Sequence, residues 1–278
     1  MILNLDPLFQ PFGNDNNIQF ESFTFSGGEP HIKIQSDLSR VKEVTITTRI
    51  QSFNDMGLLL IAVDALRRLE LRSIHLFLPY MPAARQDRVM VSGESLSVKV
   101  YADLINNLHL DSVTVFDPHS EVTPALLNNC KVIANHEFIK HVMTNIGSEV
   151  LLISPDGGAL KKIYKVSEYL GGNPVVECSK KRNVKNGQLE GFKVYEDDLK
   201  GKTCLIVDDI CDGGGTFMGL AKELKQKNAG HLYLAVSHGI FNKGVDELNQ
   251  HFTKIYTTDS FKTLDEESVE QIEIKELT

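Results

Sequence analysis

Short hydrophobic runs alternate with longer amphipathic stretches along most of the chain. The short runs are rich in apolar and β-branched residues and lie at 44–48, 73–79, 112–116, 150–154, 203–207 and 231–236. Between them, apolar residues recur at helical spacing at 57–69, 96–108, 160–170 and 217–228. The runs predict strands, and the amphipathic stretches predict helices. Strands that alternate with helices are typical of a mainly parallel sheet flanked by helices, so we expect an α/β fold.

Short polar signatures follow several of the predicted strands, two of them in each half of the chain. They lie at 84–88, 117–119, 155–158 and 208–216. A chain of 278 residues is long enough for two domains of about 140 residues each. We therefore predict two similar α/β domains, residues 1–142 and residues 143–278. Residues 180–190 carry few apolar side chains, which predicts an exposed loop or hairpin.

The composition is that of an ordinary globular protein, with 42% hydrophobic and 24% charged residues. The net charge of −8 and the pI near 5.6 argue against a nucleic-acid partner, which would require basic surface to neutralise its phosphates. No apolar run approaches the roughly 20 residues that span a bilayer, and the first residues lack the basic region of a secretory leader. We expect a cytoplasmic protein with no membrane partner.

The cysteines are scattered and show no C-x-x-C spacing. Cys130, Cys178 and Cys204 are expected to be reduced packing residues, because a chain of this length needs no disulfide to stabilise its core. Cys211 lies inside the last of the polar signatures. It is therefore a candidate reactive thiol.

The stretch 204–217, CLIVDDICDGGGTF, is the most informative in the chain. A hydrophobic strand pattern ends at Asp208 and Asp209, and the helical pattern resumes at the end of the stretch. The polar residues are thus expected on a strand-to-helix loop, where parallel sheets bind ligands. Three glycines let backbone N–H groups converge on an anion, and Thr216 and the helix N-terminus add to this, which predicts a phosphate at 212–216. The two carboxylates suit neighbouring ribose hydroxyls. The length of the pattern disfavours the alternative of a plain acidic turn.

A second polar cluster follows the strand predicted at 73–79, within the stretch PYMPAARQDR. Arginine side chains bind phosphate oxygens, and Gln or Asp can hydrogen-bond the edge of a base, so residues 85–88 predict a nucleotide site. A surface cluster of salt bridges is the alternative reading of the same residues. No G-x-x-x-x-G-K-[ST] sequence occurs, so any ATP is bound without a P-loop.

Taken together, the motifs resemble those of the ribose-phosphate pyrophosphokinases, also called phosphoribosyl diphosphate synthetases. PYMPAARQDR, VSGESLSVKVYADLINNL, FDPHS, ISPDGGALKK, SKKR, VDDICDGGGTF and SHGIF occur in the order expected of that family. The resemblance runs from about Phe25 to about Asp259. Phosphoribosyltransferases share the glycine-rich stretch, but they lack the ARQDR segment and the duplicated domain.

The resemblance implies a role for each matched residue. Those implied to hold the ribose and its 5-phosphate are Asp208, Asp209, Asp212, Gly213, Gly214, Gly215 and Thr216. Those implied to hold ATP are Arg85, Gln86, Asp87 and Arg88, joined by Phe25 and Glu29 of the FSGGE segment, which in the family reaches over from a neighbouring subunit. His119 and Asp156 are implied to organise Mg²⁺, and Lys180 and Arg182 match two basic residues of the family's mobile catalytic loop. Without the resemblance, His119 reads as a structural imidazole and the two cations as a solvated basic turn.

The implied reaction is attack of the anomeric hydroxyl of a ribose 5-phosphate unit on the β-phosphorus of ATP, with release of AMP. Mg²⁺ is the implied cofactor, and ATP and a ribose 5-phosphate-containing acceptor are the implied ligands. A homo-oligomer is implied as well, because the FSGGE segment would complete a neighbour's ATP site. Such a transfer needs in-line positioning and neutralisation of negative charge more than covalent chemistry.

The chain departs from the family pattern in three places. The segment before Phe25 is short and carries prolines, so a full first helix is not expected. Gly27 stands where the family usually has Asp or Asn, which removes a contact to the base. Gly213 stands where the family usually has Thr or Ser, and the absent side chain is expected to leave open space beside the phosphate.

Two alternatives to a ribose 5-phosphate acceptor remain from the sequence. An open phosphate end would admit an enlarged acceptor such as ADP-ribose, with unchanged chemistry. A non-catalytic regulatory homologue is the other alternative. Retention of His119, Asp156, Lys180, Arg182 and the whole glycine-rich stretch disfavours it, because a scaffold has no use for catalytic cations.

Overall fold

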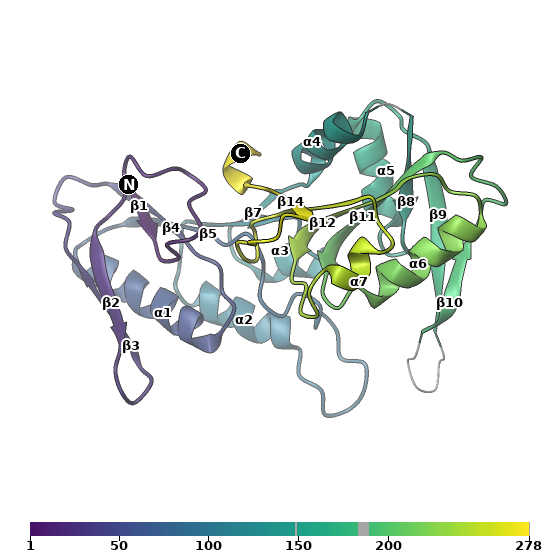
Figure 1. Cartoon of the computed structure of the whole chain (residues 1–278). Helices are drawn as coiled ribbons and strands as arrows, with labels where there is room; N and C mark the ends of the chain where they lie inside the picture. Colours follow the sequence, from purple (N-terminus) through teal and green to yellow (C-terminus); the bar gives the residue numbers. More distant parts are fainter. Residues whose placement is uncertain (148, 183–188, 278) are drawn as a thin grey trace.

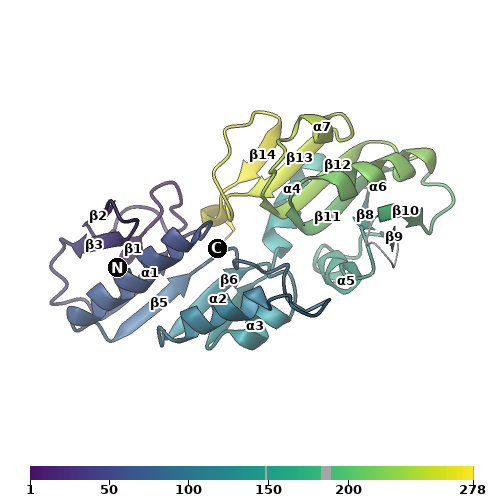
Figure 2. The ribbon, with the colours of Figure 1, turned by 90° about the horizontal axis from the view of Figure 1, so that it is seen from below.

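The first half of the chain folds around a five-stranded parallel sheet. The computed structural model describes residues 1–147, 149–182 and 189–277. In spatial order the strands are β1 (Ile2–Asn4), β4 (Glu43–Thr47), β5 (Ser73–Phe77), β6 (Ser112–Phe116) and β7 (Cys130–Ile133). Helices α1 (Phe53–Arg68), α2 (Ser97–Asn106) and α3 (Val122–Leu126) lie along one face of this sheet (Figures 1 and 2).

A two-stranded antiparallel hairpin projects from the far end of the first half. It consists of β2 (Phe20–Thr24) and β3 (Pro30–Ile34), and β3 packs against α1 (Figure 1). Residues 1–24 form strands, turns and bends but no helix, which confirms the expectation that the usual first helix is missing. The FSGGE segment forms the turn of this hairpin, at the opposite end of the molecule from β9 and β10.

The second half is built on a seven-stranded sheet. Its order is β10 (Leu189–Val194), β9 (Val175–Arg182), β8 (Val150–Ser154), β11 (Thr203–Cys211), β12 (Leu232–Gly239), β13 (Lys254–Thr258) and β14 (Val269–Ile272). All neighbours are parallel except β10, which pairs antiparallel with β9. The remaining elements are α4 (His136–Ile146), α5 (Leu160–Tyr169), α6 (Gly215–Gln226), α7 (Asp246–Asn249) and a short 3₁₀ turn at Ile274–Glu276.

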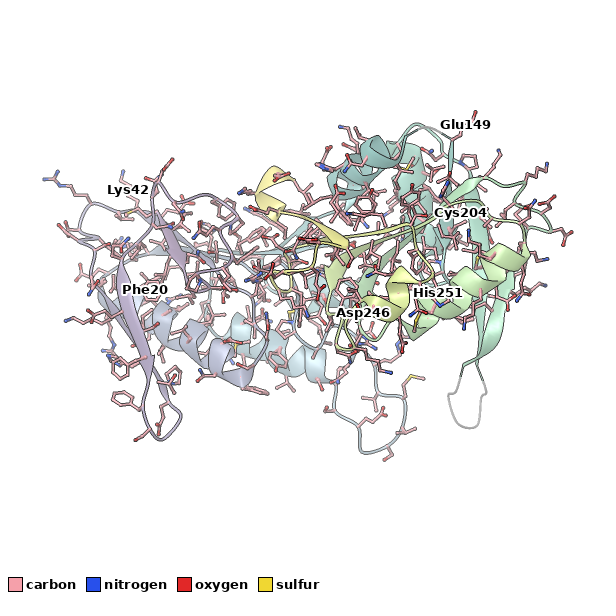
Figure 3. All side chains as sticks on the ribbon, in the orientation of Figure 1. Phe20, Lys42, Glu149, Cys204, Asp246 and His251 are labelled. Atoms are coloured by element: carbon pink, nitrogen blue, oxygen red, sulfur yellow. The ribbon has the colours of Figure 1, made fainter. Side chains whose placement is uncertain are left out.

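Strand β11 is buried on both faces because helices cover both sides of the second sheet. Leu205 and Val207 pack in the cluster that contains the apolar residues of α4 and α5. Cys204 and Ile206 point to the other face and pack with α6. Figure 3 shows Cys204 among the side chains of the second half. A strand covered on both sides needs apolar residues at successive positions, which explains its continuous hydrophobic run.

The α/β fold class predicted from the hydrophobic pattern is confirmed, and every predicted strand and helix is present. Of the residues 180–190, those at 180–182 end β9 and those at 189–190 begin β10, which pairs antiparallel with β9; residues 183–188 lie outside the described residues. The division at 142/143 stays a prediction; α4, which spans it, packs Phe138, Ile139 and Val142 into the core of the second sheet. Among the described residues, no helix is both long and apolar enough to cross a membrane.

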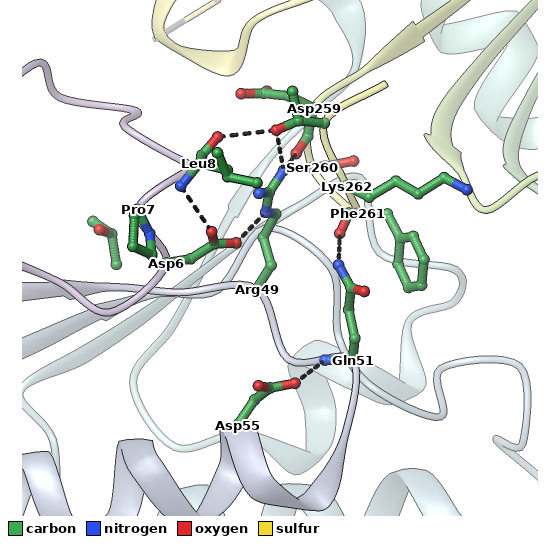
Figure 4. Close-up of polar contacts among 12 residues, drawn as sticks. Asp6, Pro7, Leu8, Arg49, Gln51, Asp55, Asp259, Ser260, Phe261 and Lys262 are labelled. Carbon is green, nitrogen blue, oxygen red and sulfur yellow. Dashed lines mark hydrogen bonds and ion pairs between the residues drawn. The ribbon is translucent and has the colours of Figure 1, made fainter. Parts of the chain in front are cut away.

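A buried arginine links the N-terminal segment to the C-terminal part of the chain (Figure 4). Arg49 donates through Nε to Asp6 at 2.5 Å and through a terminal nitrogen to the backbone carbonyl of Asp259 at 3.0 Å. The same nitrogen donates to Thr263, and the guanidinium lies over the ring of Phe9. The Arg49 side chain is only 3% exposed, so its charge depends on these partners.

We expect Arg49→Met to lower the free energy of unfolding by about 3–5 kcal/mol, because it leaves a largely buried carboxylate without its cation. The matched control is Arg68→Met, which breaks an exposed i,i+4 pair with Asp64 whose side chains are 78% and 62% exposed. That change should cost no more than about 0.5 kcal/mol. Urea denaturation measures both. Equal losses in the two variants would show that the contacts of the buried Arg49 stabilise the fold no more than an exposed ion pair does.

Candidate active site

Polar residues from the two halves of the chain meet at the carboxyl ends of the parallel strands. Arg85 of the first half pairs with Asp212 of the second at 2.5 Å. His119, just beyond β6, donates through Nδ1 to Asp209 of β11 at 2.6 Å. The nucleotide cluster predicted at 85–88 and the polar stretch 208–216, which contains the phosphate site predicted at 212–216, therefore form one polar site at the strand ends, called the cleft below.

The strand β11 extends further than the hydrophobic pattern predicted. Its pairing with β12 continues to Cys211 opposite Gly239, so Asp208 and Asp209 lie in the strand and the expectation that they lie on a loop is wrong. The loop contains only residues 212–214, and Gly215 and Thr216 open α6. Gly214, the last residue of the loop, adopts a left-handed conformation with φ of +74°, and an added Cβ would meet Leu248 at 3.0 Å. Glycine is required there for both reasons.

The pKa values of the adjacent carboxylates of β11 are shifted in opposite directions. Burial and the neighbouring Asp209 raise the pKa of Asp208 well above its usual value. Burial acts in the same direction on Asp209, but the hydrogen bond to His119 and the cation of Lys162 outweigh it and hold the pKa of Asp209 well below its usual range. Asp209 is thus the stronger hydrogen-bond acceptor for a ribose hydroxyl, while Asp208 retains a proton more readily.

The two residues predicted to organise a metal lie at the cleft but have different partners. His119 uses Nδ1 toward Asp209, and its Nε2 makes no hydrogen bond to a described residue. A histidine fixed in this way by a carboxylate is suited to bind a metal through its other nitrogen. Asp156 accepts from the backbone N–H groups of Gly158 and Ala159 and pairs with Lys180 at 2.7 Å. Within the described part of the chain, no three His, Cys, Asp or Glu side chains form a ready-made metal site.

Lys180 lies at the cleft on a strand. It belongs to β9, opposite Phe192 of β10, and its side chain is 17% exposed. Its charge also acts on Asp208. Arg182 ends β9, but its side chain and residues 183–188 lie outside the described residues. The prediction of a mobile loop here is therefore left as a prediction.

Of the residues predicted to hold ATP, the ARQDR cluster lies at the cleft and the FSGGE pair does not. Asp87 is buried and accepts from the exposed Arg88 at 3.0 Å, and Gln86 is exposed beside them. Phe25 is 52% exposed, and its ring contacts those of Phe23 and His31 of its own hairpin. Glu29 occupies the same turn, at the far end of the first half (Figure 1). Within one chain, this pair is not brought to the cleft.

Gly27 and Gly213, the two glycines that depart from the family pattern, have different surroundings. A Cβ at Gly27 would lie 2.5 Å from a carboxylate oxygen of Glu29, so glycine lets that side chain fold over the turn. A Cβ at Gly213 would lie 3.3 Å from Asn242 Oδ1 and 3.6 Å from two stem carbons of Lys243. The expectation of open space beside Gly213 is wrong, because side chains of the segment after β12 fill it.

The expectation of a reactive Cys211 is also wrong. Its side chain is fully buried, and burial together with Asp208 and Asp212 raises the pKa of the thiol to about 12. The thiolate, which is the reactive form, is therefore scarce at neutral pH. All the cysteines are free, as the sequence predicted.

The sequence did not predict the residues that hold Asp117, which lies in the same turn as His119. Asp117 accepts from Ser237 and pairs with Lys162 at 2.8 Å, and its backbone carbonyl accepts from His238 at 3.2 Å. Ser260 fixes the other ring nitrogen of His238 at 2.7 Å. Each of these residues stands within or beside a strand-end motif, but nothing in the sequence indicated that they contact one another.

Comparison with known proteins defines the class. Residues 15–108 match the family model described as the N-terminal domain of ribose phosphate pyrophosphokinase, and residues 125–271 match the phosphoribosyl transferase domain. The solved phosphoribosylpyrophosphate synthetase of Mycobacterium smegmatis superposes with a TM-score of 0.83 over 94% of this chain and 88% of that one, at 22% identity. The fold is thus the two-domain fold of the phosphoribosyl diphosphate synthetases.

Sequence relatives carry the assignment from fold to family. The ribose-phosphate pyrophosphokinase of Mycoplasma pneumoniae is 31% identical over 236 residues, 84% of this chain and 70% of that protein. That of Pyrococcus abyssi is 29% identical over 257 residues, 89% and 86% of the two chains. The chain belongs to the ribose-phosphate pyrophosphokinase family and is an enzyme of that type.

The His119–Asp209 pair makes stability depend on pH. The hydrogen bond to Asp209 raises the pKa of His119 against the opposing effect of burial. A raised pKa stabilises the fold fully below the ordinary histidine value of about 6.5, and this contribution is lost as pH rises through the folded-state pKa. We expect His119→Gln to lower the free energy of unfolding more at about pH 6 than at about pH 9, in urea denaturation with a chelator present. An equal loss at both pH values would contradict the assignment.

Proposed function

We propose that the enzyme transfers diphosphate from ATP to the anomeric hydroxyl of ribose 5-phosphate, with Mg²⁺ as cofactor and AMP as the second product. The observation that carries the proposal is the contact across the cleft between Arg85 and Asp212. This contact places residues 85–88, which are suited to bind a nucleoside triphosphate, next to residues 212–216, which are suited to bind a sugar phosphate. Donor and acceptor would then be held side by side, as direct transfer requires.

The acceptor would lie along β11 and the start of α6. The backbone N–H groups of 213–216 and the N-terminus of α6 would hold the 5-phosphate. Asp209, ionised and fixed by His119, would accept from a ribose hydroxyl. Because Asn242 and Lys243 fill the space beside Gly213, the geometry favours the small monophosphate acceptor over ADP-ribose.

The triphosphate would be bound from the first half. Arg85, whose side chain is half exposed, can exchange Asp212 for phosphate oxygens, and Arg88 with Gln86 and Asp87 would hold the nucleoside. Lys180, from β9, would neutralise charge that develops on the transferred group. Arg182 is assigned the same task by its family match alone.

Mg²⁺ fits the donor atoms at the cleft. His119 Nε2 is free of described partners and Asp156 supplies carboxylate oxygens, so these two residues would hold the ion together with phosphate oxygens and water. When bound, the ion would neutralise phosphate charge during transfer. Asp156 would first have to exchange its ion pair with Lys180, which frees Lys180 for the substrate.

The chain would act as a homo-oligomer. Phe25 and Glu29 lie at an exposed hairpin far from the cleft of their own chain, and the aromatic cluster around Phe25 is open to solvent. A neighbouring subunit is the partner that would bring this hairpin to an ATP site.

Acceptor-dependent release of AMP is the test of the reaction. We expect ATP and Mg²⁺ with ribose 5-phosphate to give AMP and phosphoribosyl diphosphate in equal amounts, measured by anion-exchange chromatography. ATP without acceptor should remain intact. Release of ADP would contradict attack on the β-phosphorus. A reaction with ADP-ribose but not with ribose 5-phosphate would contradict the proposal that ribose 5-phosphate is the acceptor.

Lys180→Ala should lower kcat by about 10²-fold or more and change acceptor binding little, because the charge of Lys180 is needed mainly in the transition state. Lys193→Ala, a change at a lysine of the neighbouring strand β10 whose ammonium lies over Tyr195, is the matched control and should keep kcat. Steady-state kinetics with calorimetric acceptor titration separates the two effects. Normal kcat with weakened binding in Lys180→Ala would mean that Lys180 only holds substrate.

A further inference from the structure

Lys162 is a cation inside the cleft to which the proposed reaction gives no task. It projects from α5, and its side chain is 30% exposed while that of its partner Asp117 is 3% exposed. Nζ lies 2.8 Å from Asp117 Oδ1 and donates to the carbonyl of Pro118 at 3.3 Å. Its charge also acts on Asp208 and Asp209. Lys162 thus reaches from the second half into a turn of the first half.

The second half makes most of the side-chain contacts to Asp117 in the turn that Lys162 contacts, while the backbone N–H of Asp117 donates to Ile133 of the first half. Asp117 adopts a positive φ of 39°, a conformation that side-chain-bearing residues rarely adopt and that persists only when surrounding contacts impose it. Ser237 and Lys162 take one carboxylate oxygen each, and His238 donates to the carbonyl of Asp117. Two residues on, His119 meets Asp209. The contacts fix the direction of the turn on both sides of Pro118.

Among the described side chains that contact Asp117, only Lys162 is a cation. The carboxylates of Asp117 and Asp209 both lie near it, and a cleft that must admit phosphates cannot leave such charges uncompensated. Ser237 and His238 are neutral donors at this turn: Ser237 is a hydroxyl, and burial lowers the pKa of His238. Among the described residues paired with Asp117, only Lys162 combines charge compensation with a direct hold on the backbone of Pro118.

We infer that Lys162 is a positioning residue: by binding Asp117 and Pro118 it holds the turn that aims His119 into the cleft and couples the first half of the site to the second. The expected effect on kcat rests on the proposed function, whereas the hold of Lys162 on the turn does not. Lys162 touches neither substrate group in this account, and it acts through the turn.

The experiment compares four variants of the full chain. Lys162→Met removes the charge at nearly constant length, and Lys162→Arg keeps it. Lys161→Met is the control, since Lys161 is the exposed neighbour on the same helix. The double variant Lys162→Met with Asp117→Asn removes both charges, so a loss of stability caused by an unpaired buried carboxylate is corrected while the hold on Pro118 stays lost.

We expect Lys162→Met to lower kcat by about 10²-fold with KM for both substrates little changed, because a misplaced catalytic group costs rate more than binding. Lys162→Arg should recover much of that rate, and Lys161→Met should match the unchanged enzyme. The double variant should regain thermal stability without regaining kcat. Recovery of both together would overturn the inference and leave Lys162 a purely structural ion pair.

Hydrogen exchange separates failure of the inference from failure of the proposed function. In the metal-free protein, the amides of Asp117, His119 and Ser120 should exchange faster in Lys162→Met than in Lys161→Met; Pro118 has no amide hydrogen. Unchanged exchange in that segment would overturn the positioning role even if the enzyme makes AMP. Absence of acceptor-dependent AMP in the unchanged protein would instead defeat the proposed reaction, and the exchange result would still decide whether Lys162 holds the turn.

Discussion

Compensation of buried carboxylates by cations from the opposite half of the chain is the interaction on which the site depends. Asp117 of the first half is paired with Lys162 of the second, Asp209 of the second with His119 of the first, and the partly exposed Asp212 with Arg85. A carboxylate removed from water needs such a partner. Asp87 and Asp156 are paired within their own halves, but Asp117, Asp209 and Asp212 have cations from the other half, so these ion pairs hold the two sides of the site together.

The topology explains why these residues meet. Parallel strands direct all their carboxyl ends to one edge, and polar residues at strand ends therefore gather there. β6 of the first sheet ends just before the turn with His119. In the second sheet β8 ends near Asp156, and the last part of β11 carries Asp208 and Asp209. Because both sheets direct these ends to the same place, the proposed nucleotide side and the proposed sugar-phosphate side would face each other there.

The sequence predicted the features that local patterns encode. The double burial of β11 gave its strand a continuous apolar run, and the glycines of 213–215 indicated the break between β11 and α6. The sequence did not reveal how far β11 continues, because that depends on pairing with β12, and the register of two strands distant in sequence leaves no local signal. The sequence did not predict the contacts of Asn242 and Lys243 beside Gly213, or the ion pair of Lys162 with Asp117, for the same reason. Each contact joins residues that are far apart in the chain.

The most direct measurement of the central claim is a crystal structure with Mg²⁺, a non-hydrolysable ATP analogue and ribose 5-phosphate bound together. The account predicts the 5-phosphate on the backbone of 213–216, the triphosphate beside Arg85 and Lys180, and the anomeric oxygen facing the β-phosphorus across the cleft. Substrates bound on separate surfaces, or an acceptor held away from Asp209 and the glycine loop, would contradict it.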